Sequence, residues 1–244
     1  MCPGTIPEHA RRRRSARATP IPSAARASIP GRPIIAADKA QSWVYTEEFI
    51  IEPDTVLEAR HRAEEFGITP VSPGVGAALR LLAATVDAHS VAEVGTGTGV
   101  SGLWLLEGIR PGGVLTTIDV EVEHQRAAKE VFGEAGVSAT RVRTISGRAL
   151  EVLPRLADGA YDMVVIDGDP AEAADYAEQG IRMLRTGGVL AVADALWYDR
   201  VADPARRDEA TVAMRELGKS VRDDERLIPA LLPSGEGLLA AVKR

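Results

Sequence analysis

The sequence predicts an α/β protein built on a doubly wound, mostly parallel sheet. Short apolar runs recur between residues 91 and 193, each ending near a glycine or an acidic residue, and helical patterns lie between them. Continuous apolar runs of this length are typical of strands that are buried on both faces. Their alternation with helices implies parallel pairing through right-handed crossovers. The five expected strands are residues 91–94, 114–120, 142–145, 163–166 and 189–193.

Helical periodicity fills the intervals between these runs. Residues 121–136 place small and apolar side chains at helical spacing and stop at a glycine. Residues 170–185 begin with a proline and are followed by a glycine pair, which is typical of the two ends of a helix. Residues 54–66 and 74–87 are expected to form two N-terminal helices ahead of the sheet.

The C-terminal end follows another pattern. Residues 227–232 and 237–242 are two apolar runs joined by a Pro-Ser-Gly-Glu segment. Two such runs across a short turn predict an antiparallel hairpin. Together with the five earlier strands, the hairpin makes a seven-stranded sheet.

Charge divides the chain into two parts. Residues 1–40 hold eight basic residues against two acidic ones and six of the 15 prolines, whereas residues 41–244 carry a net charge of −12. We expect residues 1–40 to be a disordered, basic, proline-rich arm and residues 41–244 to be a single domain. An organelle transit peptide and a nucleic-acid-binding arm are the alternatives for residues 1–40.

Composition narrows the class of protein further. The hydrophobic share of 45% and the charged share of 26% are typical of globular proteins. The single Cys2 excludes an internal disulfide and a cysteine-rich zinc site. No apolar run approaches the roughly 20 residues that span a bilayer. We therefore expect a cytoplasmic protein that binds neither nucleic acid nor membrane.

Acidic side chains and glycine loops follow the expected strands. Ligands of an open α/β sheet bind at the carboxyl ends of its strands. Each residue alone has a structural explanation, because Asp caps helices and Gly forms turns. Their joint occurrence at one edge predicts a ligand site there. The strand ends in question are Glu93–Gly99, Asp119, Ser146–Gly147, Asp167–Asp169 and Asp194.

The glycine-rich segment admits two cofactors. Residues 97–102 match G-x-G-x-x-G, and Asp119 lies 20 residues after Gly99, which favours a nicotinamide dinucleotide. Glu93, in front of the glycines, would repel a pyrophosphate but suit S-adenosylmethionine, which has cationic groups and no phosphate. Glu93 could instead hold the conformation of the loop. Asp119 serves either cofactor, because a carboxylate there can accept both ribose hydroxyls.

Four segments together resemble the class I methyltransferases and, more narrowly, the cation-dependent O-methyltransferases of the catechol and caffeoyl-coenzyme A type. They are Ala92–Ser101, Thr117–Asp119, Tyr161–Asp169 and Gly187–Trp197. The resemblance covers about residues 45–244 and leaves the basic arm unmatched. It implies a Rossmann-like methyltransferase fold, S-adenosylmethionine as methyl donor, a small hydroxylated acceptor and a homodimer.

The resemblance also implies site residues, position by position. Val71 would line the amino-acid end of the donor, Asp119 would take the ribose and Ala149 would border the adenine. Asp167 matches the carboxylate that binds a divalent cation and the acceptor hydroxyl in the family, and it is the expected catalytic residue. The full donor-binding set is Val71, Glu93, Gly95, Thr96, Ser101, Asp119, Ala149 and Asp169.

Three positions depart from the family pattern, and two of its usual polar groups are absent. An Asp-Asn pair completes the metal site of the family, but here Ala193 and Asp194 stand at those positions, and Pro170 replaces the lysine of the family. Asp167 and Asp194 could still offer oxygen ligands to Mg²⁺ or Mn²⁺. Transfer without a metal is also physically reasonable, because Asp167 can act as the base. We name no metal ligands and keep a divalent cation as an open alternative.

The leading hypothesis is a methyltransferase that acts on a hydroxyl of a small molecule. The alternatives are a nicotinamide-dependent oxidoreductase and a non-catalytic S-adenosylmethionine-binding protein. His124 lies in a charged helical stretch and is expected to be solvated. Trp197 and Tyr198 follow the fifth strand, where they could form an aromatic wall for an acceptor, pack internally or contact a second subunit.

Overall fold

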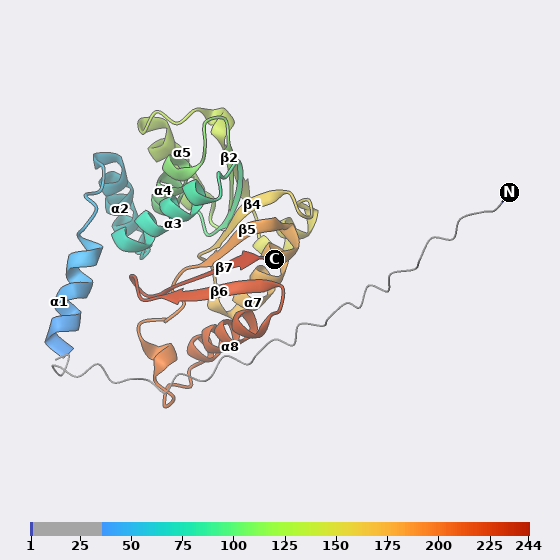
Figure 1. The fold of residues 1–244 in the computed structure, drawn as a ribbon. Coiled ribbons are helices and arrows are strands. Elements are labelled where there is room, and N and C mark those ends of the chain that lie inside the picture. Colours follow the sequence, from blue (N-terminus) through green and yellow to red (C-terminus); the bar gives the residue numbers. More distant parts are fainter. Residues whose placement is uncertain (2–35) are drawn as a thin grey trace. The chain divides into compact units, whose positions relative to one another are not determined.

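A seven-stranded sheet with the order β3-β2-β1-β4-β5-β7-β6 forms the centre of the protein (Figure 1). The computed structural model describes Met1 and residues 36–244. Strands β1 to β5 pair in parallel, and β7 pairs antiparallel with both β5 and β6. The strands are β1 Ser90–Val94, β2 Val114–Asp119, β3 Val142–Ser146, β4 Tyr161–Ile166, β5 Leu184–Val192, β6 Leu227–Leu232 and β7 Leu238–Lys243. The predicted sheet and its terminal hairpin are confirmed.

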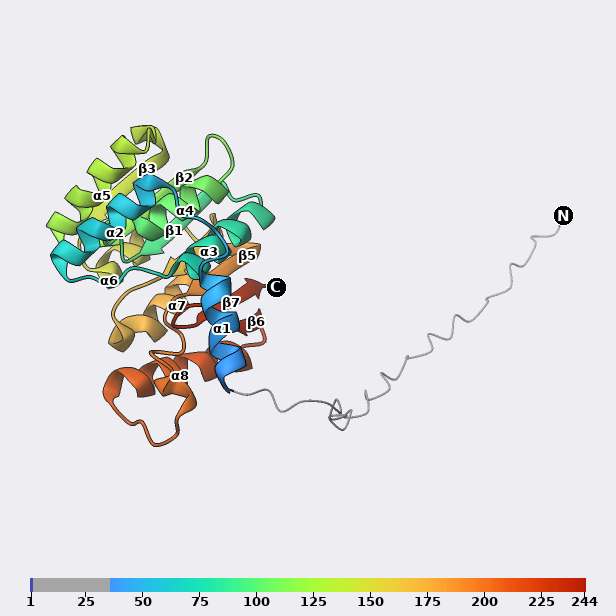
Figure 2. The same cartoon turned by 90° about the vertical axis from the view of Figure 1, so that its left-hand side faces the viewer.

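Helices cover both faces of this sheet (Figure 2). Helices α2 to α5 pack on one face and α6 to α8 on the other, and each group shares its own apolar cluster with the strands. The α-helices are α1 Ala36–Glu47, α2 Asp54–Phe66, α3 Pro73–Thr85, α4 Val100–Gly108, α5 Val122–Glu134, α6 Ala149–Val152, α7 Ala173–Met183 and α8 Glu209–Asp223. Short 3₁₀ segments are η1 Ala139–Arg141, η2 Leu153–Arg155, η3 Pro170–Glu172 and η4 Arg200–Ala202. Among the described residues, no helix combines the length and apolarity needed to cross a membrane.

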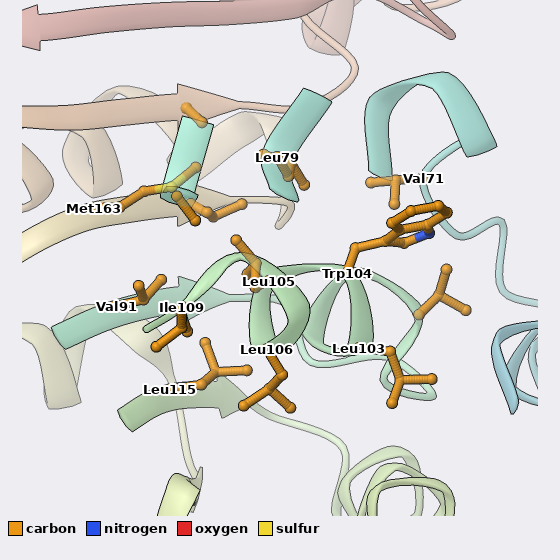
Figure 3. Close-up of a cluster of buried hydrophobic side chains, with 14 of the residues drawn as sticks. Val71, Leu79, Val91, Leu103, Trp104, Leu105, Leu106, Ile109, Leu115 and Met163 are labelled. Atoms are coloured by element: carbon orange, nitrogen blue, oxygen red, sulfur yellow. The ribbon is translucent and has the colours of Figure 1, made fainter. Parts of the chain in front are cut away.

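Helix α4 is packed on every side beneath the glycine loop (Figure 3). The indole of Trp104 is fully buried and extends toward Val71. It lies against Gly76 of α3, where a Cβ atom would come within 2.3 Å of the indole nitrogen. This close approach fixes the start of α4, and with it the floor of the loop that precedes the helix.

Three element boundaries differ from the expectation. Strand β5 begins at Leu184 rather than at residue 189, because its pairing with β4 starts at Tyr161–Leu184 and resumes at Met163–Val189, so that a bulge in β5 itself takes up the glycine pair. Helix α8 was not predicted, although Asp208 caps it and its buried residues recur at helical spacing. Helix α1 begins at Ala36, inside the range expected to be an arm, and the rest of that arm, residues 2–35, lies outside the described residues.

Helix α1 is attached to the domain through its last residue. Residues 39–46 are exposed, whereas Glu47 is only 8% exposed. One carboxylate oxygen of Glu47 accepts the Gly74 N–H (2.8 Å), and the other accepts the Gly235 N–H (2.7 Å) and the Ser234 hydroxyl (3.0 Å). Glu47 thus joins the start of α3 to the turn between β6 and β7.

Candidate active site

A cavity of about 370 Å³ opens at the carboxyl ends of the central parallel strands. Small-molecule pockets are typically roughly 300–1,000 Å³. The wall is formed by the glycine loop after β1, Asp119 after β2, residues 147–149 after β3, residues 167–169 after β4 and residues 68–71 before α3. The predicted edge of the sheet therefore does carry a concave site.

The glycine loop owes its path to a close approach between neighbouring strand ends. Gly95 has a φ of +92°, and a Cβ atom there would lie 1.9 Å from the carbonyl oxygen of Asp167. The Asp167 N–H donates to the Val94 carbonyl (2.8 Å), which holds the two strand ends together. Only glycine fits this position, so the loop turns over the ends of β1 and β4 and opens the cavity.

Asp119 is held by backbone amides at the edge of the cavity. Its Oδ2 accepts the Gly97 N–H (2.9 Å), and its Oδ1 accepts the Glu121 N–H (2.9 Å). A carboxylate oxygen has two acceptor positions. Each oxygen of Asp119 therefore keeps one position that a hydroxyl of a ligand can use.

Glu93 lies beneath the cavity and is absent from its wall. The side chain is fully buried, and its Oε2 accepts the Thr117 hydroxyl (2.6 Å), which lies 2.7 Å from the hydroxyl of Thr96. Burial raises the pKa of Glu93 to about 7, against the lowering effect of Thr117 and Ser101. Oε1 forms no hydrogen bond within the described residues. The arrangement favours the reading in which Glu93 holds the loop, and direct contact with a donor stays a prediction.

Asp167 has a different environment from Asp119. It lines the cavity, and no hydrogen bond from the described residues reaches its carboxylate. Burial raises the pKa of Asp167 to about 8, and repulsion from Asp194, Glu93 and Asp119 adds to the effect. A carboxyl group without hydrogen-bond partners and with a pKa near neutral pH can take up and release a proton, and in its ionised form it can accept one from a bound molecule.

Asp194 faces Asp167 across a second, much smaller cavity. This cavity, of about 10 Å³, is lined by both carboxylates together with Ala193, Pro170 and Trp197. Burial raises the pKa of Asp194 to about 6, and Glu236 adds repulsion.

The residues around Asp167 and Asp194 do not fit a resident divalent cation. No group of three or more His, Cys, Asp and Glu side chains that could hold a metal ion occurs in the described part of the chain. Ala193 lines the same small cavity and offers no oxygen ligand from its buried side chain. Ca²⁺ takes about six to eight oxygen ligands, more than these two carboxylates supply, and Mg²⁺ held by them would keep several of its waters.

The cavity brings together all but one of the predicted donor-binding residues. Asp167 lies in the same wall, and Glu93 is the exception described above. The predicted residues that line the cavity are Val71, Gly95, Thr96, Ser101, Asp119, Ala149 and Asp169.

The wall also holds residues that were not predicted as site residues, and four of them have side chains that contact Asp119 or one another. His124 was expected to be solvated; its side chain is 23% exposed, lines the cavity, lies 3.7 Å from Asp119 and packs edge-on against Phe66. Arg148, Glu172 and Tyr176 line the wall and contact one another. Glu172 and Tyr176 are four residues apart after a strand end, a spacing that could have identified them.

The loop after β5 places the two predicted aromatic residues differently. Trp197 lines the small cavity, whereas Tyr198 is 45% exposed, and their rings meet edge to face at 5.4 Å. Asp194, Trp197 and Tyr198 all have φ between 46° and 55°, in the left-handed region. Such residues persist only where surrounding contacts hold them, and here they aim the loop at Asp167.

Known proteins similar to this chain share its fold and one enzyme family. The profile described as O-methyltransferase matches residues 45–244. A Mycobacterium tuberculosis protein named as an O-methyltransferase is 51% identical, with 88% of this chain and 96% of the relative covered. A Mycobacterium ulcerans protein of the same designation is 52% identical, with 88% and 95% covered.

Solved structures that are similar to this chain have the same fold, and one of them is an O-methyltransferase. A Corynebacterium glutamicum protein is 35% identical and superimposes with a TM-score of 0.78, with 85% of this chain and 97% of that chain covered. The O-methyltransferase TomG of Streptomyces achromogenes, solved in complex with S-adenosylmethionine, is 27% identical with a TM-score of 0.74, with 83% and 96% covered. The Rossmann-like methyltransferase fold predicted from the sequence is confirmed.

Proposed function

We propose a function from the premise that this chain belongs to the O-methyltransferase family. The family match, the names of the relatives and the similar structure solved with S-adenosylmethionine identify the protein as an S-adenosylmethionine-dependent O-methyltransferase. The nicotinamide alternative is set aside, because the match covers the segment that carries G-x-G-x-x-G. Our proposal concerns the acceptor, which we infer to be a hydroxyl group of a small molecule, and the part of each residue in its methylation.

The main support for the proposal is a pair of carboxylates at the cavity: Asp119 is held by hydrogen bonds, and Asp167 accepts none from the described residues. Asp119 is restrained by two backbone amides and keeps an acceptor position on each oxygen, which suits the two hydroxyls of a ribose. Asp167 has no hydrogen-bond partner among the described residues and is suited to a reacting proton. The cavity thus fits a nucleoside donor on one side and an acceptor hydroxyl on the other.

We propose these parts for the other wall residues. Val71 borders the amino-acid end of the donor, Gly95, Thr96 and Ser101 surround its methionine part, and Asp169 lies beside it. Ala149 borders the adenine. Glu93 does not touch the donor in this proposal. It accepts a hydrogen bond from the Thr117 hydroxyl, which in turn contacts and positions the hydroxyl of Thr96 in the wall.

Asp167 deprotonates the acceptor in the proposed mechanism. When bound, S-adenosylmethionine supplies an electrophilic methyl group on a positively charged sulfur. The wall residues orient the two reactants, which can contribute roughly 7–11 kcal/mol toward lowering a barrier. Asp167 takes the hydroxyl proton on a carboxylate oxygen and later passes it to solvent, and a base of this kind typically contributes about 10²–10⁴-fold in rate. No step is routed through a metal ion.

The non-catalytic alternative remains as the second candidate. Ala193 and Pro170, which remove two polar groups of the family pattern, are the observations that favour it. Asp167 favours turnover, because a binding protein has no need of a free carboxylate in its cavity. Release of S-adenosylhomocysteine with phenols, catechols or coenzyme A thioesters would decide for the enzyme, and its absence across the panel would favour the binding protein.

We also propose that the protein is a cytoplasmic homodimer. The end of α1 and the segment after it expose Trp43, Tyr45, Phe49 and Ile51, with exposed fractions of 44% to 91%. Exposed apolar clusters of this kind are typical of protein interfaces. A second copy of the chain covering this surface would bury the exposed apolar side chains of Trp43, Tyr45, Phe49 and Ile51.

Replacing Asp119 tests the donor site. Asp119→Ala removes the proposed ribose ligand and also frees the Gly97 and Glu121 amides, so we expect S-adenosylhomocysteine to bind at least tenfold more weakly, about the loss of one charged hydrogen bond. Isothermal titration calorimetry measures the change, with Asp175→Ala on the exposed face of α7 as the control. Unchanged affinity of Asp119→Ala would contradict the proposed donor site.

A further inference from the structure

Arg148, Glu172 and Tyr176 form a polar group in the wall of the donor cavity that the proposed function leaves without a part. Arg148 comes from the loop after β3, Glu172 from η3 and Tyr176 from α7. The guanidinium of Arg148 and the Tyr176 hydroxyl both donate to the carboxylate of Glu172, and the Tyr176 bond measures 2.5 Å. Three elements thus converge on a single carboxylate at the cavity.

The carboxylate of Glu172 is oriented and still has acceptor positions left. Oε1 faces Arg148 and Oε2 faces Tyr176, so each oxygen uses one position and keeps another. Tyr176 is 5% exposed, and burial followed by its bond to Glu172 raises the pKa of its hydroxyl, which keeps the proton that it donates. An oriented carboxylate that only accepts hydrogen bonds is suited to a ligand group that only donates them.

The position of this group matches the base end of the donor. The Gly147 N–H donates to the Asp119 carbonyl (2.9 Å), so the loop after β3 begins beside the residue that we assign to the ribose. Arg148 follows directly, and its contact with Glu172 brings the carboxylate to that side of the cavity. A base attached to a ribose at Asp119 therefore extends toward Ala149 and Glu172.

We infer that Glu172 recognises the 6-amino group of the adenine of the methyl donor, with Arg148 and Tyr176 orienting its carboxylate. The inference rests on the donor site proposed above. The exocyclic amine of adenine donates hydrogen bonds, and a carboxylate accepts them. A 6-oxo base would instead set an acceptor oxygen against the negatively charged carboxylate with no hydrogen between them, which is unfavourable.

Two ligands that differ along the 6-position edge of the base test the inference: adenine has a 6-amino group and an acceptor at N1, whereas the 6-oxo base has an acceptor oxygen and an N1–H. Calorimetry compares S-adenosylhomocysteine with S-inosylhomocysteine, in which the 6-amino group is replaced by an oxo group. We expect the native chain to prefer the adenosyl ligand by about tenfold or more. Glu172→Gln preserves the volume of the side chain but offers an N–H₂ group to the oxo oxygen, so the preference should fall to less than about threefold.

Two further variants separate recognition from a structural effect. Tyr176→Phe removes one of the groups that orient Glu172 and should reduce the preference for the adenosyl ligand in part. This variant provides a test if Glu172→Gln does not fold. Glu178→Gln on the same helix also breaks an ion pair with an arginine, Arg226, but outside the cavity, and it should keep the native preference.

The outcomes distinguish the two levels of the argument. If the native chain binds neither ligand, the proposed donor site is wrong and this inference falls with it. If it binds both equally, or if Glu172→Gln and Tyr176→Phe both keep the native preference, the donor site stands and the inference is overturned. An equal weakening of both ligands by Glu172→Gln would also overturn it, because Glu172 would then only shape the cavity.

Discussion

Asp119 and Asp167 are the same residue type at the ends of two strands of one sheet, yet their surroundings prepare them for different tasks. Backbone amides hold Asp119 on both oxygens. Asp167 has no hydrogen bond from the described residues, and its pKa is raised to about 8 by burial and by neighbouring carboxylates. One carboxylate is therefore built to hold a ligand, and the other is left free to react with one.

This difference predicts a separation of binding from turnover. Asp167→Asn removes the proposed base but keeps the shape of the cavity, so we expect methyl transfer to slow by about 10²–10⁴-fold. The affinity for S-adenosylhomocysteine should stay within about threefold, because Asp167 is not the ribose ligand. Turnover assays and calorimetry on the same preparation measure both values. Full activity of Asp167→Asn would refute the assignment of the base.

The short donor set beside Asp167 predicts that chelation has little effect. Ala193 offers no oxygen ligand between Asp167 and Asp194, so we expect EDTA to change turnover by less than about twofold. The measurement is initial rate against EDTA, followed by titration with Mg²⁺ and Mn²⁺. Loss of activity in EDTA and its recovery with either cation would show that two carboxylates and solvent suffice for a metal site here.

Several loops around the site are held by contacts between elements rather than by their own turns. The N–H groups of Ala195 and Leu196 donate to the Gly237 and Glu236 carbonyls (2.9 and 2.8 Å), which ties the loop after β5 to the hairpin turn. Glu47 of α1 then ties that turn to the start of α3. A single carboxylate from the N-terminal helix thus couples segments on two sides of the cavity.

The Glu47 anchor predicts a pH-dependent contribution to stability. Burial would raise the pKa of Glu47, but its hydrogen bonds to Ser72, Gly235, Gly74 and Ser234 outweigh burial and lower it. A carboxylate whose pKa is lower in the folded state than in the unfolded state stabilises the fold above its unfolded pKa of about 4.5, and this contribution disappears as the pH falls through the folded value.

Glu47→Gln tests this contribution. We expect the variant to lose about 2 kcal/mol of unfolding free energy at pH 7, where the charged hydrogen bonds are intact, and much less at low pH, where native Glu47 is protonated. Chemical unfolding at several pH values measures the difference. Glu48→Gln, one residue later and exposed, is the matched control. A difference between native chain and Glu47→Gln that is independent of pH would refute the electrostatic explanation.

At the scale of the whole molecule, α1 is the element with the least packing of its own. Its residues 39–46 are exposed, and it projects from the rest of the domain (Figure 1). An apolar helix in water is stable chiefly through tertiary packing of its apolar face. The second copy proposed above would supply that packing.

Mass measurement tests the proposed homodimer. Light scattering on the native protein as it elutes from a sizing column should give twice the chain mass of 25.9 kDa. Trp43→Ser combined with Phe49→Ser should shift the equilibrium toward the single chain, because both side chains belong to the exposed apolar surface. Val212→Ser on α8, exposed and on the other face of the sheet, is the control. A native chain of single mass would exclude the dimer at that concentration.

Local patterns in the sequence were enough to predict the strands of the sheet and most residues of the candidate site. Apolar runs that end in Gly or Asp predicted five parallel strands, and the edge rule for α/β sheets then placed Asp119 and Asp167 together. Helix α8 and the early start of β5 were missed. The start of β5 depends on the pairing of Leu184 with Tyr161 of β4 beyond a bulge in β5, and periodicity within β5 does not reveal that pairing.

The rest of the site depends on contacts between residues far apart in the chain. Glu93 and Asp119 look alike as acids at strand ends, but packing buries Glu93 beneath the loop and leaves Asp119 in the wall. Arg148 and Glu172 meet because the ends of β3 and β4 lie at the same edge of the sheet. Residue order therefore indicates which groups reach that edge, whereas their final exposure, partners and pKa values arise from the packing of separate elements against one another.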